Sequence, residues 1–168
     1  MLRTPRVNPR VRSNPSEYWN HQGRDLAGVI APGARLVGYD FRGAKLADAM
    51  LRGADMRGVD LEGADVGGAS LQGADLTGAN LKRADLSDAF LSKAYLQEAD
   101  LRGADLKWAK LTDAHLARAN LKGADLRVAT ITGINLEDAN VSEADFRDSV
   151  GMTAELKADL KRRGAIVD

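Results

Sequence analysis

An apolar residue recurs at every fifth position through most of this 168-residue chain, and this spacing restricts the possible folds more than any other feature. The run covers residues 36–146 and has 23 positions, of which 17 are Leu. A second register lies two residues earlier and is Ala at 20 of its 23 positions. No insertion breaks either register, so the segment is a series of internal repeats.

A period of five fits neither an α-helix nor a flat β-strand. Five residues turn an α-helix by about 140° beyond one full turn, which would spread the Leu residues around its surface. In a flat strand the side chains alternate, so every second Leu would face the other side. Residues two apart nevertheless share one side of a short extended segment, and a turn in the other three can bring the chain back. We therefore expect the chain to coil around its own Ala and Leu residues.

The residues between the two registers favour tight turns. Gly occupies the second position after the Leu register in 11 of the 23 repeats, as at Gly43 and Gly103. Gly tolerates the positive φ angle that tight turns often need. Asp or Asn often precedes the Leu register, and these side chains accept hydrogen bonds from turn amides.

Residues 74–86, ADLTGANLKRADL, and residues 99–106, ADLRGADL, resemble the pentapeptide-repeat family. The resemblance covers residues 34–149 and implies an all-β solenoid, a right-handed four-sided β-helix with one repeat on each side. Residues 20 apart would then stack on the same face, about 4.8 Å apart. Stacked coils contact only their neighbours, so the open ends of such a rod need caps.

The N-terminal part is divided into two segments. Residues 1–16 contain four Arg, three Pro and no acid, which predicts a basic extended arm. A solvated tail is the favoured interpretation, while contact with an acidic partner and organelle targeting stay open. Residues 17–33 are interpreted as an N-terminal cap and degenerate repeats, with Tyr18 and Trp19 covering the first coil.

The C-terminal residues 150–168 are expected to form a capping helix and tail after the β-helix of residues 34–149. Thr153 is a suitable N-cap, Glu155 lies in the first turn and basic residues lie in the last. Leu156 and Leu160 share an apolar stripe that should cover the final coil. The resemblance also leaves open an end-to-end homodimer through this terminus, as the alternative to a monomer.

Composition limits the classes of function. The chain has no Cys, 24 basic and 24 acidic residues, and no apolar run long enough to span a bilayer. Residues 34–149 carry 15 basic and 19 acidic side chains, which argues against direct nucleic-acid binding. We expect a cytoplasmic protein without membrane association, cofactor or metal site. A filled solenoid without insertions offers no pocket for catalysis, so no enzyme is expected.

One predicted column is acidic, and it consists of Asp65, Asp85, Asp105, Asp125 and Asp145. The favoured interpretation is that each Asp caps its own turn. The alternative is mimicry of a DNA phosphate row, as the resemblance implies for relatives that bind DNA gyrase and protect it from quinolones. The balanced charge of the chain and a neighbouring basic column argue against that alternative.

The best candidates for a partner-binding surface are Phe90, Tyr95, Trp108 and His115. Phe90 and Tyr95 take the place of Asp or Asn in consecutive repeats, so neither the turn nor the core requires them. Exposed aromatic side chains dominate interface energetics, although scattered surface residues in a tolerant repeat are the slightly favoured interpretation. The sequence therefore predicts a non-enzymatic protein-interaction or scaffolding module, with modulation of DNA gyrase or topoisomerase as the alternative.

Overall fold

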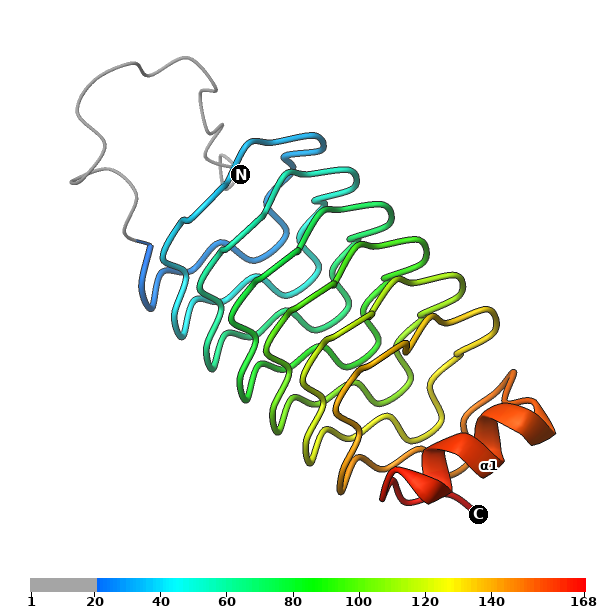
Figure 1. Ribbon diagram of the computed structural model, residues 1–168. Coiled ribbons are helices and arrows are strands. Elements are labelled where there is room, and N and C mark those ends of the chain that lie inside the picture. Colours follow the sequence, from blue (N-terminus) through cyan, green and yellow to red (C-terminus); the bar gives the residue numbers. More distant parts are fainter. Residues whose placement is uncertain (1–20) are drawn as a thin grey trace.

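The computed structural model describes residues 21–168, in which the chain winds into a rod of stacked four-sided coils (Figure 1). Each five-residue repeat makes one side: an extended residue, a turn, and a single bridged residue. Parallel β-bridges join residues 20 apart, beginning with Asp25 and Lys45 and continuing to Thr130 and Val150. In this part of the chain the one helix is α1, Ala154–Arg162.

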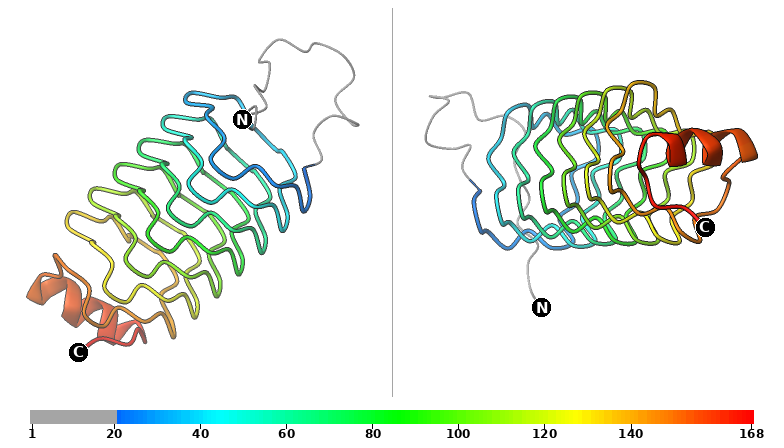
Figure 2. Two further views of the ribbon diagram at one scale, coloured as in Figure 1. Left: turned by 180° about the vertical axis from the view of Figure 1, so that it is seen from behind. Right: turned by 60° about the horizontal axis from the view of Figure 1, so that its bottom comes forward.

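The four sides are called faces A, B, C and D after the core residues at their centres. Face A is centred on Phe41, Leu61, Leu81, Leu101, Leu121 and Val141, and face B on Leu46, Val66, Leu86, Leu106, Leu126 and Phe146. Face C is centred on Leu51, Leu71, Leu91, Leu111 and Ile131, and face D on Leu36, Met56, Leu76, Leu96, Leu116 and Leu136. Every face runs the length of the rod, as the views in Figure 2 show.

The interior consists of the two apolar registers. Leu86, for example, is fully buried, and its neighbours in the stack are Val66 and Leu106. None of the described polar or charged residues is buried. Each buried Leu contributes about 1.5–3 kcal/mol by leaving water, so the two registers provide the main force that holds the coils together.

The backbone hydrogen bonds repeat in the same way in each coil. Leu86 N–H donates to Asp105 O at 2.7 Å, Asp88 N–H to Lys107 O at 2.9 Å, and Ala89 N–H to Leu86 O at 3.1 Å. The first two bonds join neighbouring coils and the third closes the turn. The polar backbone is thereby paired along the rod.

The corner residue, the second after each core Leu position, has a positive φ angle in all 23 repeats from Gly38 to Asp148. Eleven of these residues are Gly, which has no Cβ atom to clash in this conformation. The other twelve include Trp108 (φ 58°) and Val128 (φ 61°). For residues with a Cβ atom this backbone conformation costs about 1–2 kcal/mol, and inter-coil bonding and core packing offset that cost.

The coil pattern begins well before residue 34. Bridges join Asp25 to Lys45 and Ile30 to Met50, although Pro32 interrupts the sequence pattern. The core positions of this first coil are only partly buried, among them Leu26 and Leu36. The predicted arm, residues 1–16, and the predicted covering residues Tyr18 and Trp19 lie outside the described residues.

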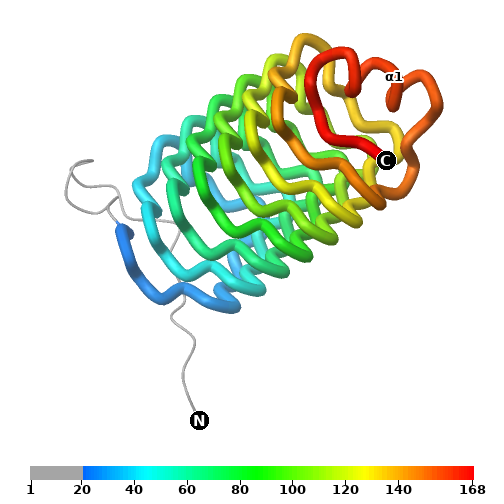
Figure 3. The backbone as a smooth tube through the Cα atoms, turned by 90° about the horizontal axis from the view of Figure 1, so that it is seen from below, coloured from blue at the N-terminus to red at the C-terminus, as the bar shows by residue number. Residues whose placement is uncertain are grey.

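Helix α1 covers the other end of the rod, as predicted (Figure 3). The Thr153 side chain caps it by accepting a hydrogen bond from Leu156 N–H at 3.1 Å. Leu160 is fully buried against the last coil. Arg163 donates to the carbonyl oxygens of Leu136, at 3.0 Å, and of Ala139.

The tail after α1 returns to the rod and adds one further bridged residue to face B. Ile166 forms a parallel bridge with Asp145, with Ile166 N–H donating to Ala144 O at 2.8 Å. The tail therefore pairs backbone groups that the last coil would otherwise leave open.

Candidate partner-binding surface

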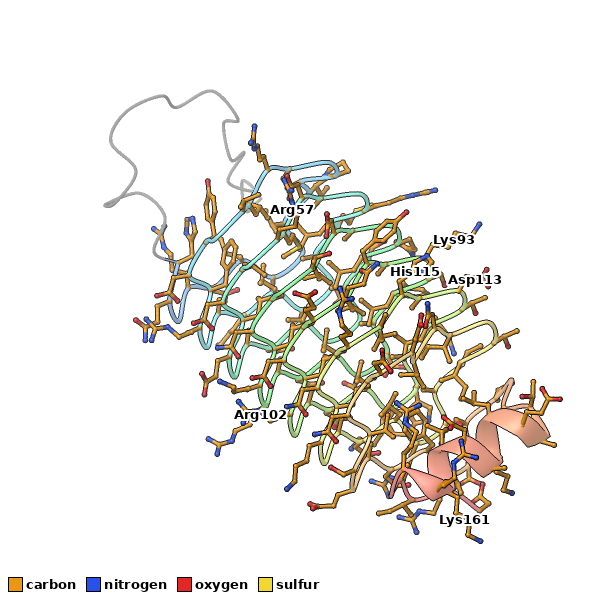
Figure 4. All side chains as sticks on the ribbon, viewed as in Figure 1. Arg57, Lys93, Arg102, Asp113, His115 and Lys161 are labelled. Atoms are coloured by element: carbon orange, nitrogen blue, oxygen red, sulfur yellow. The ribbon has the colours of Figure 1, made fainter. Side chains whose placement is uncertain are left out.

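Ion pairs cover faces A, B and D. A recurrent arrangement places Asp before a core residue and Arg after it, so that both side chains lie on the same face two residues apart. Arg102 Nη2 is 2.7 Å from an Asp100 oxygen in this arrangement on face A (Figure 4). The Arg102 hydrogen bond holds the pKa of Asp100 below its ordinary value. On face D, Arg118 and Glu98 instead join neighbouring coils at 2.6 Å.

The predicted acidic column forms a continuous row of bridges on face B. Every carboxylate in it accepts a hydrogen bond from the backbone N–H two residues ahead. The five donors are Gly67, Ser87, Lys107, Arg127 and Arg147, at 2.9–3.2 Å. Each Asp therefore caps its own turn, which is a structural reason for its presence.

The column is not uniformly acidic, because its C-terminal three members are paired. Lys107 lies 2.8 Å from Asp105, and Arg127 and Arg147 pair with Asp125 and Asp145 at 2.7 and 2.6 Å. These arginine hydrogen bonds lower the pKa of both Asp125 and Asp145. Asp65 and Asp85 have Gly67 and Ser87 at the corresponding positions, and neither forms a salt bridge with any described residue.

The structure brings two of the four candidate residues into contact. Tyr95 and His115 are bridged neighbours on face D, and their rings stack at 5.1 Å with an interplanar angle of 9°. Phe90 lies on face C between Ser70 and Lys110. Trp108 occupies the corner between faces B and C, with Lys107 Nζ 5.9 Å from its ring centroid. Tyr95 and His115 therefore lie together on face D, whereas Phe90 lies on face C and Trp108 at the corner between faces B and C.

Face C also exposes aliphatic residues that were not among the candidates predicted from the sequence. The column that contains Phe90 includes Ile30, Met50 and Val150, with 67%, 49% and 58% of their surfaces exposed, against 45% for Phe90. These four residues are called the apolar column. The signal was present in the sequence, because grouping the residues at a period of 20 places all four together.

The charged side chains of face C are unpaired within the described chain. They are Arg52, Lys93, Lys110 and Asp113, and none of them forms a salt bridge or a side-chain hydrogen bond with another described residue. Lys93 and Asp113 occupy the corner between faces C and D in adjacent coils, near His115 (Figure 4). The Asp113 carboxylate lies over Gly133, on the side away from Lys93, where a Cβ atom at residue 133 would collide with it.

Residues 21–168 contain no group of three or more His, Cys, Asp or Glu side chains suited to a metal ion. Within the same residues, α1 is too short and too polar to cross a membrane. Face C, with exposed apolar and unpaired charged side chains, is consequently the candidate partner-binding surface.

The family model for pentapeptide repeats matches eight copies over residues 25–58, 54–92, 91–127 and 109–148. The chain therefore belongs to the pentapeptide-repeat family, and the predicted right-handed four-sided β-helix with a C-terminal capping helix is confirmed.

Several solved structures are similar to the chain. One is HetL, a pentapeptide repeat protein involved in heterocyst differentiation regulation in the cyanobacterium Nostoc sp. PCC 7120, with 31% identity over 74% of this chain and 73% of HetL (TM-score 0.30). Another is a pentapeptide repeat protein from the Arabidopsis thaliana thylakoid lumen, with 30% identity over 88% and 81% of the two chains (TM-score 0.28). QnrB1, a plasmid-mediated fluoroquinolone resistance protein, is 20% identical over 88% and 84% (TM-score 0.36). No curated protein matches the chain.

Proposed function

We propose that this protein is a non-enzymatic protein-binding module whose partner docks on face C. The observation that carries the proposal is the apolar column, which lies on the one face whose charged side chains are all unpaired within the described chain. Exposed large apolar side chains that line up on one surface are typical of interaction sites. Phe90, near the middle of the column, is the expected anchor.

The other faces are less favourable for docking. Many of their carboxylates and guanidinium groups already form ion pairs, such as Arg57 with Asp55 at 2.8 Å on face D. A partner would have to desolvate these groups without offering them better contacts. Docking on face C removes apolar surface from water instead.

A catalytic function has little support in the described residues. The interior is filled by Ala and Leu, and the polar side chains point outward from flat faces and corners rather than converging. His115, one possible general base, stacks on Tyr95. Its partner ring is aromatic rather than a nucleophile.

The weaker alternative is that the protein binds DNA gyrase with an acidic surface that mimics DNA. A phosphate row would need a continuous line of free negative charge, whereas three of the five Asp in the acidic column are paired with Lys107, Arg127 and Arg147. We expect the purified protein to leave gyrase supercoiling unaffected. Potent, saturable inhibition would promote this alternative above face C.

Affinity capture from the native host with matched variants tests the proposal. The double variant Met50→Ser with Phe90→Ser should lose specific partners that the unmodified protein retains. Tyr95→Asn, an aromatic substitution on face D, is the control and should retain them. Both variants should melt within a few degrees of the unmodified protein, because the side chains point outward. Partners that survive the face C variant would place the site elsewhere.

A further inference from the structure

The unpaired charged residues of face C, together with Phe90, form two complementary pairs. Lys93 and Asp113 are opposite charges on one corner column, one coil apart, and Phe90 and Lys110 are bridged neighbours on face C, also one coil apart. On the other faces most such charges are satisfied within the same coil or the next, as between Arg118 and Glu98. On face C they remain available to another molecule.

Consider a two-fold axis that lies in the plane of face C and runs perpendicular to the long axis of the rod. It lays a second rod antiparallel on the first, so that each column meets its own copy with the order of coils reversed. The contact is isologous, because a residue that meets another is met by it in return. A residue one coil before the axis therefore faces the residue one coil after it.

We propose that the partner of face C is a second copy of this chain, bound antiparallel with the two-fold axis midway between the coils of Phe90 and Lys110. This inference rests on the proposed function, since it names the partner of the same face. The register places Lys93 of each copy opposite Asp113 of the other, and Lys110 of each copy over the Phe90 ring of the other. Both contacts occur twice, as an ion pair at the rim and as a cation–π contact inside.

Several further pairs fit the same register, whereas Ile30 lies beyond the last coil of the other copy. Met50 faces Val150, which covers two exposed apolar side chains in each half of the contact. At the corner between faces B and C, Val128 faces Gly68, over which the Asp48 carboxylate of the same copy lies. The hydroxyl-bearing residues also meet, with Ser70 opposite Thr130. One pair of like charges, Asp48 opposite Asp148, falls at the outer rim, where water screens it.

Shifting the axis by half a coil removes this complementarity. An axis through the coil of Phe90 would place Lys93 opposite its own copy and leave Asp113 opposite Gly73. Lys110 would then face Ser70 rather than an aromatic ring. The charges of Lys93 and Asp113 therefore specify one antiparallel register over its nearest competitor.

Analytical ultracentrifugation of charge-swapped variants over a range of protein concentrations tests the inference. The unmodified protein should dimerise. Lys93→Asp and Asp113→Lys should each weaken the dimer at least tenfold, because each places like charges opposite one another twice. The double variant Lys93→Asp with Asp113→Lys restores opposite charges and should recover most of the affinity. Both substitutions are at the exposed corner, so all three variants should leave the melting temperature nearly unchanged.

Two control variants fix the interpretation. Arg118→Glu on face D and Lys161→Glu on α1 should leave the dimer unchanged. A dimer that is lost only in Lys161→Glu would be an end-to-end assembly and would overturn the inference. A monomer at every soluble concentration, or a double variant that stays as weak as the single ones, would also overturn it.

The outcomes separate this inference from the proposed function. If the protein is monomeric but still loses a captured partner in Met50→Ser with Phe90→Ser, face C binds a different protein and only the second copy is excluded. If neither self-association nor partner capture responds to that variant, the proposed function fails as well.

Discussion

The two ends of the rod are built from the same repeat but are finished differently. At the C-terminal end, α1 buries Leu160 completely and Arg163 binds two carbonyl oxygens of the last coils. At the N-terminal end of the described residues, Leu26 and Leu36 stay partly exposed. A coil is stabilised only by its neighbours, so the same repeat is more stable where a further layer covers it.

Three stacked rings partly compensate at the N-terminal end. His21, Tyr39 and Phe41 pack face to face with centroid distances of 5.1–5.7 Å. Such stacks add about 0.5–1.5 kcal/mol per pair to the burial of the rings. We therefore expect the first coil to open locally before α1 does.

The largest loss of stability is expected from a charge buried in the middle of the rod, because the coils on both sides pack against that coil. Leu86→Asp places a carboxylate between Val66 and Leu106 without a partner, at a cost of several kcal/mol. The rod should unfold, with loss of the β signal in circular dichroism. Phe90→Asp, on the outside of the same coil, is the control and should stay folded. A folded Leu86→Asp protein would show that the ends do not depend on the middle.

A matched pair of truncations compares the ends directly. Leu160→Ala should cost about 2–5 kcal/mol, because it leaves a cavity beneath α1. Leu26→Ala should cost roughly 1 kcal/mol, because part of that side chain already contacts water. Urea denaturation of the two variants measures the difference. Equal losses would contradict the ranking of the ends.

The arginine that holds the cap gives the next smaller effect. Arg163→Ala removes two hydrogen bonds from a charged donor to Leu136 and Ala139, and should cost about 1–3 kcal/mol. Arg162→Ala is the control, since the side chain of Arg162 is 74% exposed and, among the described residues, it forms a salt bridge with Asp159 alone. Thermal unfolding should separate the two variants. A similar melting temperature for both variants would show that Arg163 does not stabilise the cap.

The smallest effect is a difference in pH response. Burial, followed by the Arg24 charge, lowers the pKa of His21, so protonation favours the open first coil. Neutral His21 therefore stabilises the first coil. This stabilisation is complete above the pKa of histidine in the unfolded chain, about 6.5, and is lost as the pH falls through the lower pKa of His21 in the folded chain. At the other end the Arg163 hydrogen bond lowers the pKa of Asp159, whose contribution is lost only below about 4.

Hydrogen exchange, corrected for the intrinsic rate, measures this difference. Between pH 7 and about 5, exchange should accelerate in the first coil, for example at Gly23 N–H, which donates to Arg42 O. Exchange in α1 should remain unchanged over that range. In His21→Gln the acceleration should disappear. Acceleration at both ends together would indicate global rather than local opening.

The fold was predictable because every repeat repeats the same constraint. Ala and Leu two residues apart predict that one side of each repeat faces the interior. Thr153, Leu156 and Leu160 predict that the coils end and that a helix covers the last one. The twelve non-Gly corner residues were not predicted to share the positive φ angle of Gly. Inter-coil bonding fixes the backbone there regardless of the side chain, so propensity alone gives no signal.

The candidate surface was only partly predictable. Phe90 was recognised because it departs from Asp or Asn, whereas Met50 and Val150 matter only because they share its column. Tyr95 and His115 were grouped with Phe90 because they lie within about one coil of it, but the turns at Lys93 and Asp113 place them on face D. The pairing of Asp with Arg two residues later was also present in the sequence, and its effect on the acidic column became clear only from the geometry.

The unbroken 20-residue register of bridges has a consequence for how such a gene can change. Duplicating 20 codons would lengthen the protein by one layer and leave every surface motif in phase, so that the new layer matches those on both sides. Duplicating five codons would keep the interior equally well packed but would rotate all later residues by a quarter turn. The apolar column would then be cut and its second half moved to a different side, with the fold intact. Natural length variants should therefore differ by multiples of 20 residues wherever a whole side of the molecule is under selection.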